Sequence, residues 1–319
     1  MQIISVMRCL GKKDVMNKLL KAAKNLINNP HLIYPYLGSF DFFNWLPDAM
    51  YLKGCFRAKM GYKLDLQNPK TFNEKLQWLK LYDRNPAYTQ MVDKYAVRDY
   101  IKNTIGEEYL IPLLGVWDSF EEIDFDTLPN QFVLKTNHDS GTVIICRDKN
   151  SFNIEEARKK ITKALSYNYF YPGREWPYKD VIPKIIAEKY MCDSNYDDLI
   201  DYKLLCFNGK VMCEFTCTNR RSKSGLNVTF FDREWERLPF ERHYPKDLTH
   251  ISKPESFSKM IDISERIAKD IDCRFVRIDF YEINGKPYFG EFTLYPGSGM
   301  EEFTPSKWDL ILGSWLRLE

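Results

Sequence analysis

Four polar residues near the C-terminal end of the chain have the types and spacing of a metal-dependent site. Arg277 and Asp279 are separated by one apolar residue, and Glu291 and Thr293 by another. Because successive side chains of a β-strand point to opposite faces, each pair shares one face of its strand. Facing carboxylates repel unless a cation lies between them, and their hard oxygen atoms suit Mg²⁺, which also binds nucleotide phosphates. The alternative is a solvated face on which Arg277 pairs with Asp279.

The relative position of the two carboxylates depends on the turn between these strands. Asn284-Gly285 is a strong hairpin signal. A two-residue loop would pair position 283 with position 286 and point Glu291 away from Asp279. A three-residue loop over 284–286 would pair position 283 with position 287 and place Asp279 opposite Glu291, with β-carbons about 4.5 to 5.5 Å apart. Because the metal chemistry requires the second register, we expect the three-residue loop.

Two lysines and a short polar loop have the character of a phosphate-binding region. Lys135 lies within an apolar strand, where a charge is costly without an anionic partner. The strand leads into residues 137–142, which are small and polar and can offer backbone N–H groups to phosphates. Lys94 lies in a predicted helix. Each feature alone is explained equally well by a lysine beside a hairpin turn or by a surface lysine paired with an acid.

The hydrophobic pattern predicts the elements that position these residues. Thr71 and Glu74 form a capping box, which indicates that a helix begins there. Strands and helices occur in runs rather than in strict alternation, which favours two α+β lobes over a Rossmann sheet. The other predicted helices cover residues 87–100, 154–167 and 255–271, and the predicted strands cover residues 131–136, 142–147, 181–190, 201–207, 211–217, 227–231, 275–282 and 287–294.

The composition is that of a globular chain of 319 residues, long enough for one two-lobed domain or two domains. With 46 Lys and Arg against 44 Asp and Glu, the chain has no overall field that would attract nucleic acid. Its eight cysteines form no CxxC pair, so we interpret them as reduced packing residues. We find no signal peptide and no run of about 18 uncharged apolar residues, so we expect a cytoplasmic protein.

Positive charge is concentrated near the N-terminus. Residues 1–63 contain ten Lys or Arg against three acids, so this segment carries +7 and the remainder −5. Between residues 13 and 27, apolar residues recur at helical spacing with lysines elsewhere, which predicts a basic amphipathic helix. Such a helix either docks on its own domain, the more common case, or lies on an anionic membrane surface. An aromatic stretch at residues 34–45 either packs internally or rests at an interface.

Taken in chain order, these segments resemble the ATP-grasp superfamily. The stretch from Arg277 to Ser298 is similar to the RxDF…NExNTxPGxT stretch of D-alanine–D-alanine ligases. Glu188-Lys189-Tyr190-Met191 resembles the EKYL hinge that holds adenine in biotin carboxylase, and Lys94 and Lys135 fall where the two phosphate lysines lie. The sequence from Asn68 onward more closely resembles the TupA-like branch, which is named for teichuronopeptide biosynthesis and associated with surface-polysaccharide gene clusters. The resemblance covers about residues 60 to 305.

The resemblance implies an ATP-dependent carboxylate–amine ligase that forms an amide through an acyl phosphate, with ATP and Mg²⁺ as cofactors. By analogy, its substrates would be a uronic acid of a surface polysaccharide or its precursor and an amine. The alternatives are a sugar or polyol kinase with the same fold, a glycosyltransferase, and a non-catalytic ATP-binding scaffold of a polysaccharide assembly complex. We expect no nucleic-acid partner, and the expected membrane role is peripheral contact with the inner face of the membrane through the N-terminal helix.

The resemblance also implies a role for each candidate residue. The catalytic and metal-binding candidates are Arg277, Asp279, Glu291 and Thr293, the last of which replaces an Asn common in the family. The nucleotide-binding candidates are Lys94, Lys135, His138, Ser140, Gly141, Glu188, Lys189, Tyr190, Met191 and Lys203. The substrate-binding candidates are Arg220, Arg221, Gly297, Ser298 and Gly299. The implied segments are a basic helical extension (residues 1–62), a helical lead-in (63–112), a small ATP-grasp lobe (113–187) and a large lobe with the metal site (188–319).

Overall fold

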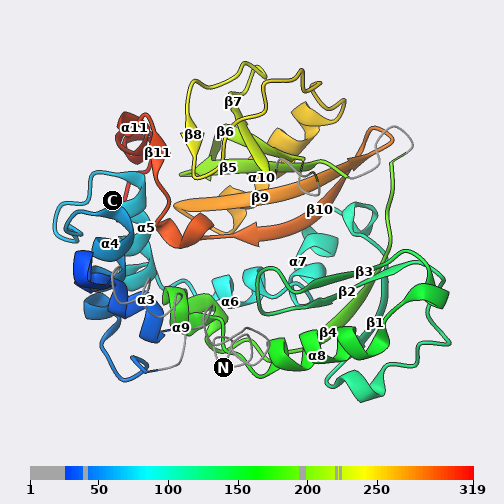
Figure 1. Ribbon diagram of the computed structural model, residues 1–319. Coiled ribbons are helices and arrows are strands. Elements are labelled where there is room, and N and C mark those ends of the chain that lie inside the picture. Colours follow the sequence, from blue (N-terminus) through cyan, green and yellow to red (C-terminus); the bar gives the residue numbers. More distant parts are fainter. Residues whose placement is uncertain (1–25, 39–41, 194–198, 220–221, 223–224) are drawn as a thin grey trace.

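The computed structural model describes residues 26–38, 42–193, 199–219, 222 and 225–319. In these residues the chain forms two main antiparallel β-sheets flanked by helices (Figure 1). This arrangement confirms the α+β class predicted from the sequence. No helix in the described part of the chain is long and apolar enough to cross a membrane. Arg220, Arg221 and most of the predicted amphipathic helix at residues 13–27 lie outside the described residues.

The smaller sheet has four strands in the order β1-β4-β2-β3. In the central strand β2 (Phe132–Thr136), Phe132 and Leu134 are buried against Ile161 of the helix α8 (Ile154–Leu165). Because side chains alternate along a strand, Lys135 points to the opposite face. The remaining strands are β1 (Leu113–Trp117), β3 (Val143–Cys146) and β4 (Ile185–Lys189).

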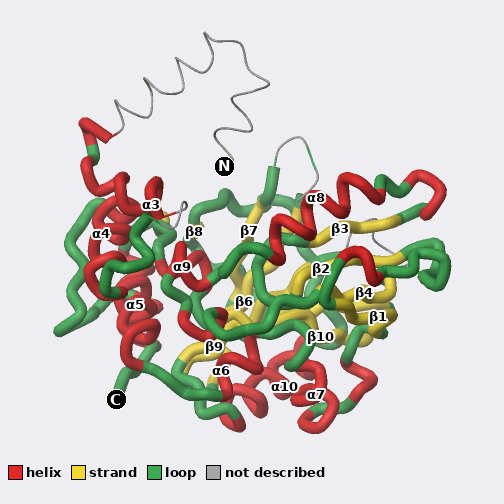
Figure 2. The backbone as a smooth tube through the Cα atoms, turned by 90° about the horizontal axis from the view of Figure 1, so that it is seen from below, coloured by secondary structure: helices red, strands yellow, loops and turns green. Residues whose placement is uncertain are grey.

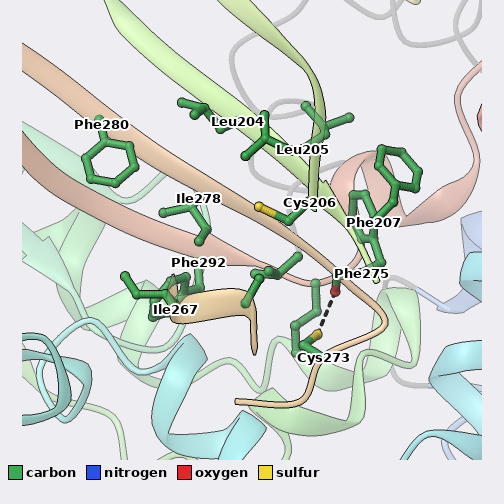
Figure 3. Close-up of a cluster of buried hydrophobic side chains, with 14 of the residues drawn as sticks. Leu204, Leu205, Cys206, Phe207, Ile267, Cys273, Phe275, Ile278, Phe280 and Phe292 are labelled. Atoms are coloured by element: carbon green, nitrogen blue, oxygen red, sulfur yellow. Dashed lines mark hydrogen bonds between the residues drawn. The ribbon is translucent and has the colours of Figure 1, made fainter. Parts of the chain in front are cut away.

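The larger sheet has five strands in the order β10-β9-β5-β6-β7. Alternation places Leu204 and Ile278 on one face and their neighbours Lys203 and Asp279 on the other. Figure 3 shows Leu204 and Ile278 in a buried cluster that includes Ile267 of the covering helix. The elements are β5 (Asp201–Phe207), β6 (Lys210–Thr218), β7 (Asn227–Phe231), β9 (Phe275–Ile283), β10 (Lys286–Thr293) and the covering helix α10 (Phe257–Asp270).

The helix α5 (Phe72–Tyr82) begins at the predicted capping box. The hydroxyl of Thr71 accepts a hydrogen bond from the N–H of Glu74, and the Glu74 carboxylate accepts one from the N–H of Thr71. α5 packs against the C-terminal helix α11 (Lys307–Trp315). The capping box therefore fixes where the helical flank of the large sheet begins.

The helix predicted over residues 87–100 is two helices, α6 (Ala87–Val92) and α7 (Val97–Thr104). Asp93 separates them, because its carboxylate oxygen Oδ1 accepts hydrogen bonds from the backbone N–H groups of residues 95 and 96 at 2.8 and 3.1 Å. An aspartate that bonds nearby backbone groups competes with helix propagation. Lys94 therefore lies in a turn and not within a helix.

The N-terminal described segment contains α3 (Ile33–Gly38) and α4 (Asp48–Met60). These helices lie with α5 at one flank of the molecule, while α6, α7 and α10 lie together at another (Figure 2). All seven cysteines in the described residues are free, as expected. The remaining elements are η1 (Pro30–Leu32), η2 (Glu107–Tyr109), η3 (Phe120–Glu122), η4 (Lys149–Ser151), α9 (Phe170–Gly173), η5 (Trp176–Tyr178), β8 (Glu241–Arg242), η6 (Pro296–Gly299) and β11 (Phe303–Thr304).

Candidate active site

A pocket of about 910 Å³ is lined by strands of both main sheets. Its wall on the small-sheet side comes from β2, β3 and β4, and its wall on the large-sheet side comes from β5, β6, β9 and β10. Eleven of the predicted site residues line it: Lys94, Lys135, Ser140, Gly141, Glu188, Lys189, Tyr190, Met191, Lys203, Asp279 and Glu291. Residues separated by nearly 200 positions in the sequence thus meet in one cavity.

The turn between β9 and β10 differs from the prediction. Position 283 pairs with position 286, so the loop has two residues and not three. Asn284 and Gly285 have φ angles of +51° and +72°, and both lie in the left-handed region that a type I′ turn requires. Continued without interruption, this register would point Glu291 away from Asp279.

A β-bulge in the edge strand β10 reverses that effect. Regular pairing runs as far as Phe289 and resumes one position out of step at Phe292, so Gly290 and Glu291 together oppose Asp279. The extra residue returns Glu291 to the face of Asp279. The guanidinium atom Nη2 of Arg277 lies 2.7 Å from Asp279 Oδ2 and 3.3 Å from Glu291 Oε1. The expected juxtaposition therefore arises from a bulge that the sequence analysis did not predict.

Asp279 is buried between two cations. Arg277 donates from Nε to Asp279 Oδ1 at 2.6 Å, and the ammonium of Lys203, directly across the ladder on β5, donates to Oδ2. Burial raises the pKa of Asp279, but Arg277 and Lys203 outweigh burial and hold that pKa below its ordinary value. Burial likewise lowers the pKa of Lys203, while Asp279 and Asp201 raise it to a net value above the ordinary one. Both members of the Lys203–Asp279 pair are therefore charged at neutral pH.

Lys135 has the anionic partner that its position requires. Its ammonium lies 2.5 Å from Glu188 Oε2, and Arg98 Nη1 lies 3.1 Å from Glu188 Oε1. Arg98 also donates to the carbonyl of Ile111 at 2.8 Å. Sequence reasoning missed Arg98, whose partner Glu188 lies 90 positions away in the chain.

Lys94 links the two halves of the pocket. Its ammonium donates to the carbonyl oxygen of Asp139 in the loop after β2 and lies 3.8 Å from Glu291 Oε2 on β10. The carboxylate of Asp139 accepts hydrogen bonds from the hydroxyls of Thr136 and Thr142. Two threonines therefore fix the loop whose Ser140 and Gly141 line the pocket.

Asn137 holds this loop to two other segments, and sequence reasoning did not single it out. Its amide nitrogen donates to Asp93 Oδ1 at 2.9 Å and to the carbonyl of Ile182 at 3.0 Å, and its amide oxygen accepts from the N–H of Lys184 at 2.6 Å. Its backbone carbonyl accepts from the N–H of Lys94 at 3.1 Å. Asn137 is fully buried, so it fixes the position of Lys94 relative to β2 and β4.

The ion pairs around the pocket form two networks, and in each the cations outnumber the carboxylates that they pair with; Asp201, which raises the pKa of Lys203, is a further acid of the pocket lining. Three cations, Lys94, Lys203 and Arg277, contact the two carboxylates Asp279 and Glu291. In the other network Lys135 on β2 and Arg98 on α7 both contact the carboxylate of Glu188 on β4. Because cations in a partly enclosed site attract anions, this arrangement is suited to a polyanionic ligand such as a nucleotide phosphate.

Six described candidates are not among the residues that line the pocket, and three of them lie beside it. His138 is buried with its ring atom Nε2 3.2 Å from the carbonyl oxygens of both Ala164 and Tyr167, so its ring faces the end of α8. Arg277 lies behind the carboxylates, with its guanidinium 5.8 Å from the ring centroid of Phe215. Thr293 is half-buried and pairs with Arg277 in the β9–β10 ladder. We therefore leave His138 out of the nucleotide site that we propose.

The residues Gly297 to Gly299 form a turn outside the pocket lining. All three have φ angles between +54° and +60°. The carbonyl of Ser298 accepts hydrogen bonds from the ammonium of Lys80 at 2.8 Å and from the amide of Gln77 at 3.0 Å, both on α5. Burial lowers the pKa of Lys80 to about 8 although the nearby Glu175 opposes this shift. The buried amine of Lys80 therefore holds this turn in place.

The described residues contain no cluster of three or more His, Cys, Asp or Glu side chains suited to a metal ion. Asp279 and Glu291 nevertheless supply two hard oxygen ligands on one face, and the Arg277 guanidinium already contacts both. A site that holds one cation between two carboxylates fits Mg²⁺ whose remaining ligands are waters and phosphate oxygens.

The comparisons with known proteins agree with the resemblance noted from the sequence. Residues 74–317 match the family described as TupA-like ATPgrasp. Among curated proteins, none matches this chain. Similar solved structures include a D-alanine–D-alanine ligase from Bacillus anthracis complexed with ATP, which is 17% identical with a TM-score of 0.39, over 64% of this chain and 55% of that one.

Two further structures extend this comparison. N5-carboxyaminoimidazole ribonucleotide synthetase from Thermus thermophilus is 12% identical over 70% of this chain and 51% of its own, with a TM-score of 0.37. The biotin carboxylase domain of Hydrogenobacter thermophilus 2-oxoglutarate carboxylase is 17% identical over 72% of this chain and 47% of its own, with a TM-score of 0.38. This chain thus spans about half the length of each of these proteins.

Proposed function

Because this chain belongs to the TupA-like ATP-grasp family, we propose that it is an ATP-dependent ligase that joins a carboxylate to an amine through an acyl phosphate. One observation carries the proposal. Asp279 and Glu291 share a face of the pocket with Lys94 and Lys203, and Lys135 lies on the facing wall. An enzyme that transfers a phosphoryl group needs such a combination of metal ligands and phosphate-binding cations.

The nucleotide would lie between the two main sheets. Lys94, Lys135 and the backbone of Ser140 and Gly141 would contact its phosphates. Glu188 already binds Lys135 and Arg98 through both carboxylate oxygens, so its role would be to orient Lys135. The adenine would then be bound by the backbone after β4, at Lys189 to Met191, which lines the pocket.

Asp279 and Glu291 would hold Mg²⁺, and Thr293 is the candidate for a third ligand. Bound there, Mg²⁺ would neutralise charge on the β- and γ-phosphates. Lys203 and Arg277 would add positive charge near the transferred group and keep Asp279 ionised, because both already bond that carboxylate. The pocket walls would exclude water that would otherwise hydrolyse a reactive acyl phosphate.

In the proposed reaction an oxygen of the substrate carboxylate attacks the γ-phosphorus. The bond from the γ-phosphorus to the bridging oxygen breaks, and ADP leaves. The nitrogen of the amine then attacks the acyl carbon, the carbon–oxygen bond to phosphate breaks, and the nitrogen loses a proton. The products are an amide, ADP and inorganic phosphate.

We further propose that the carboxylate belongs to a uronic acid and that the amine is an amino acid or amino alcohol. The support for this part is the association of the TupA-like branch with surface polysaccharides, which is an argument by analogy. Arg220, Arg221 and the turn from Gly297 to Gly299 remain the proposed contacts for these substrates. The polysaccharide role therefore needs a direct test.

The test is a matrix of uronic acids against amines with the full chain and Mg·ATP. We expect ADP release to require one acid and one amine together, and the product mass to equal the sum of both substrates minus one water. Glu291→Gln should lower the signal by about 10² to 10³-fold, and the exposed Asp262→Asn on α10 should leave it unchanged. A stable phosphorylated product without consumption of amine would instead identify a kinase.

A further inference from the structure

The segment before residue 60 exposes large apolar side chains at close intervals. The exposed fractions are 75% for Trp45, 59% for Phe42 and 57% for Met50, and Tyr36 is 39% exposed. Scattered exposed apolar residues are normal on a protein surface, but a group of them marks an interaction site.

These residues lie on α3, at the start of α4 and on the connection between the two helices. The N–H of Phe42 donates to the carbonyl of Leu37 at 3.3 Å, and the N–H of Met50 donates to the carbonyl of Pro47 at 3.0 Å. The ring of Phe42 lies edge-on against that of Phe43, with centroids 5.2 Å apart. This segment lies at the flank where Figure 1 shows α3 and α4 away from the smaller sheet.

A basic stripe on α4 continues this apolar group. Met50, Lys53 and Arg57 are all exposed and are spaced at i, i+3 and i+7, which places them along one face of the helix. The opposite face is buried against the N-terminal core. The acid of the same helix, Asp48, lies 3.4 Å from the guanidinium of the buried Arg174. The exposed stripe therefore carries positive charge that this acid does not neutralise.

We propose that this surface, which we call the N-terminal patch and define as Tyr36, Phe42, Trp45, Met50, Lys53 and Arg57, binds a membrane of anionic phospholipids. Aromatic side chains lie favourably at the level of the lipid headgroups, and each Lys or Arg near an anionic bilayer adds to the attraction. The sequence adds six more Lys or Arg and one acid in residues 1–25. This inference concerns a surface outside the active site and does not depend on the proposed reaction.

Charge favours a membrane over a second copy of the chain. A symmetric dimer places the same patch of both copies face to face. Residues 1–63 carry ten Lys or Arg against three acids, so such a contact would bring like charges together. An anionic bilayer instead offers the opposite charge over a broad surface.

The experiment is sedimentation of the full chain with vesicles. Vesicles of phosphatidylcholine with phosphatidylglycerol should bind the protein, vesicles of phosphatidylcholine alone should bind it weakly, and high salt should release it because salt screens the attraction. Phe42→Ser with Trp45→Ser, and separately Lys53→Glu with Arg57→Glu, should each weaken binding by about tenfold or more. Ile182→Ser is the matched control, because Ile182 is 71% exposed in another segment, and it should bind like the wild type.

Three results would overturn the proposal. They are no binding to the anionic vesicles at low salt, equal binding to both kinds of vesicle, and unchanged binding of both double variants. A dimer that forms without vesicles and is lost in the apolar double variant, with no vesicle binding, would assign the patch to a second copy. If the apolar variant has a lower melting temperature than the wild type, the charge variant alone decides the result, because Lys53 and Arg57 are exposed.

Discussion

Glu291 reaches the face of Asp279 because two residues of β10, Gly290 and Glu291, oppose that single residue of β9. The bulge brings the backbones close together. A β-carbon added to Gly290 would lie 3.2 Å from the carbonyl oxygen of Asp279 and 3.4 Å from its β-carbon. The position of Glu291 beside Asp279 therefore depends on the absence of a side chain at Gly290.

Replacement of Gly290 should affect activity more than stability. We expect Gly290→Val to lower ATP-dependent turnover by about 100-fold, because a branched side chain must displace Asp279 from Lys203 and Arg277. Crowding of this kind costs about 1 to 3 kcal/mol of unfolding free energy. Gly290→Ala should have a smaller effect on both turnover and unfolding free energy. Measurements of ADP release and thermal unfolding test this, and normal turnover of the valine variant would contradict the structural role given to the bulge.

The two carboxylates should respond differently to removal of their charge. Glu291→Gln should lower turnover by about 10² to 10³-fold with little change in melting temperature, because Glu291 is one-third exposed. Asp279→Asn should lower both the turnover and the melting temperature, because it leaves Lys203 and Arg277 buried with a weaker partner. Kinetics and calorimetric unfolding of both variants, with Asp262→Asn as the exposed control, check this difference. Near-normal turnover of either site variant would refute the metal site.

Local sequence signals predicted much of the fold. The capping box at Thr71 and the position of the Asn284-Gly285 turn depend on interactions within a few residues, so the sequence alone reveals them, although the loop length expected at this turn was wrong. The alternation around Asp279 likewise predicted which neighbours share its face. These features need no knowledge of distant contacts.

Long-range contacts limited the prediction of the site. Gly290 is the one local mark of the bulge, and a glycine within a strand does not by itself fix where pairing shifts, which depends on the contact with Asp279. Asn137 and Arg98 act on residues 44 to 90 positions away. His138 has a residue type that suits phosphate binding, yet its ring lies against the carbonyl groups at the end of α8. Residue type and spacing therefore predicted which residues belong to the site better than they predicted how the side chains of those residues are oriented.

Lys135 should contribute directly to nucleotide affinity. A hydrogen bond to a charged group contributes about 1.5 to 3 kcal/mol, so Lys135→Ala should weaken binding of a non-hydrolysable ATP analogue by about 10 to 150-fold. Lys163→Ala is a suitable control because Lys163 is exposed on α8 of the same lobe. Isothermal titration calorimetry measures both affinities. Equal affinities for wild type and Lys135→Ala would remove Lys135 from the phosphate site.

Asn137 should act on nucleotide binding through the position of Lys94. We expect Asn137→Ala to weaken binding of the ATP analogue by about tenfold and to lower the unfolding free energy by about 1 to 3 kcal/mol, because buried partners lose their hydrogen bonds. Asn137→Asp should be no better, since it places a second carboxylate beside Asp93. Asn103→Ala, at an exposed position of α7, is the control for calorimetry and unfolding. Unchanged binding in Asn137→Ala would show that Lys94 needs no such support.

The Lys203–Asp279 pair should make the stability of the protein depend on pH in the acid range. The folded pKa of Asp279 lies below its ordinary value of 3.8, so the unfolded chain binds the proton more readily than the folded chain. The stabilisation from this group is therefore complete above the unfolded pKa and is lost as pH falls through the folded pKa. Lys203→Met removes one of the two cations that oppose burial, so the pKa of Asp279 rises towards its unfolded value and this group loses less stability as pH falls. Melting temperatures between pH 3 and 7 measure the loss, and Lys210→Met, at an exposed position of the adjacent strand, should lose as much as the wild type. An equal acid loss in Lys203→Met and in the wild type would mean that Arg277 alone sets the ionisation of Asp279.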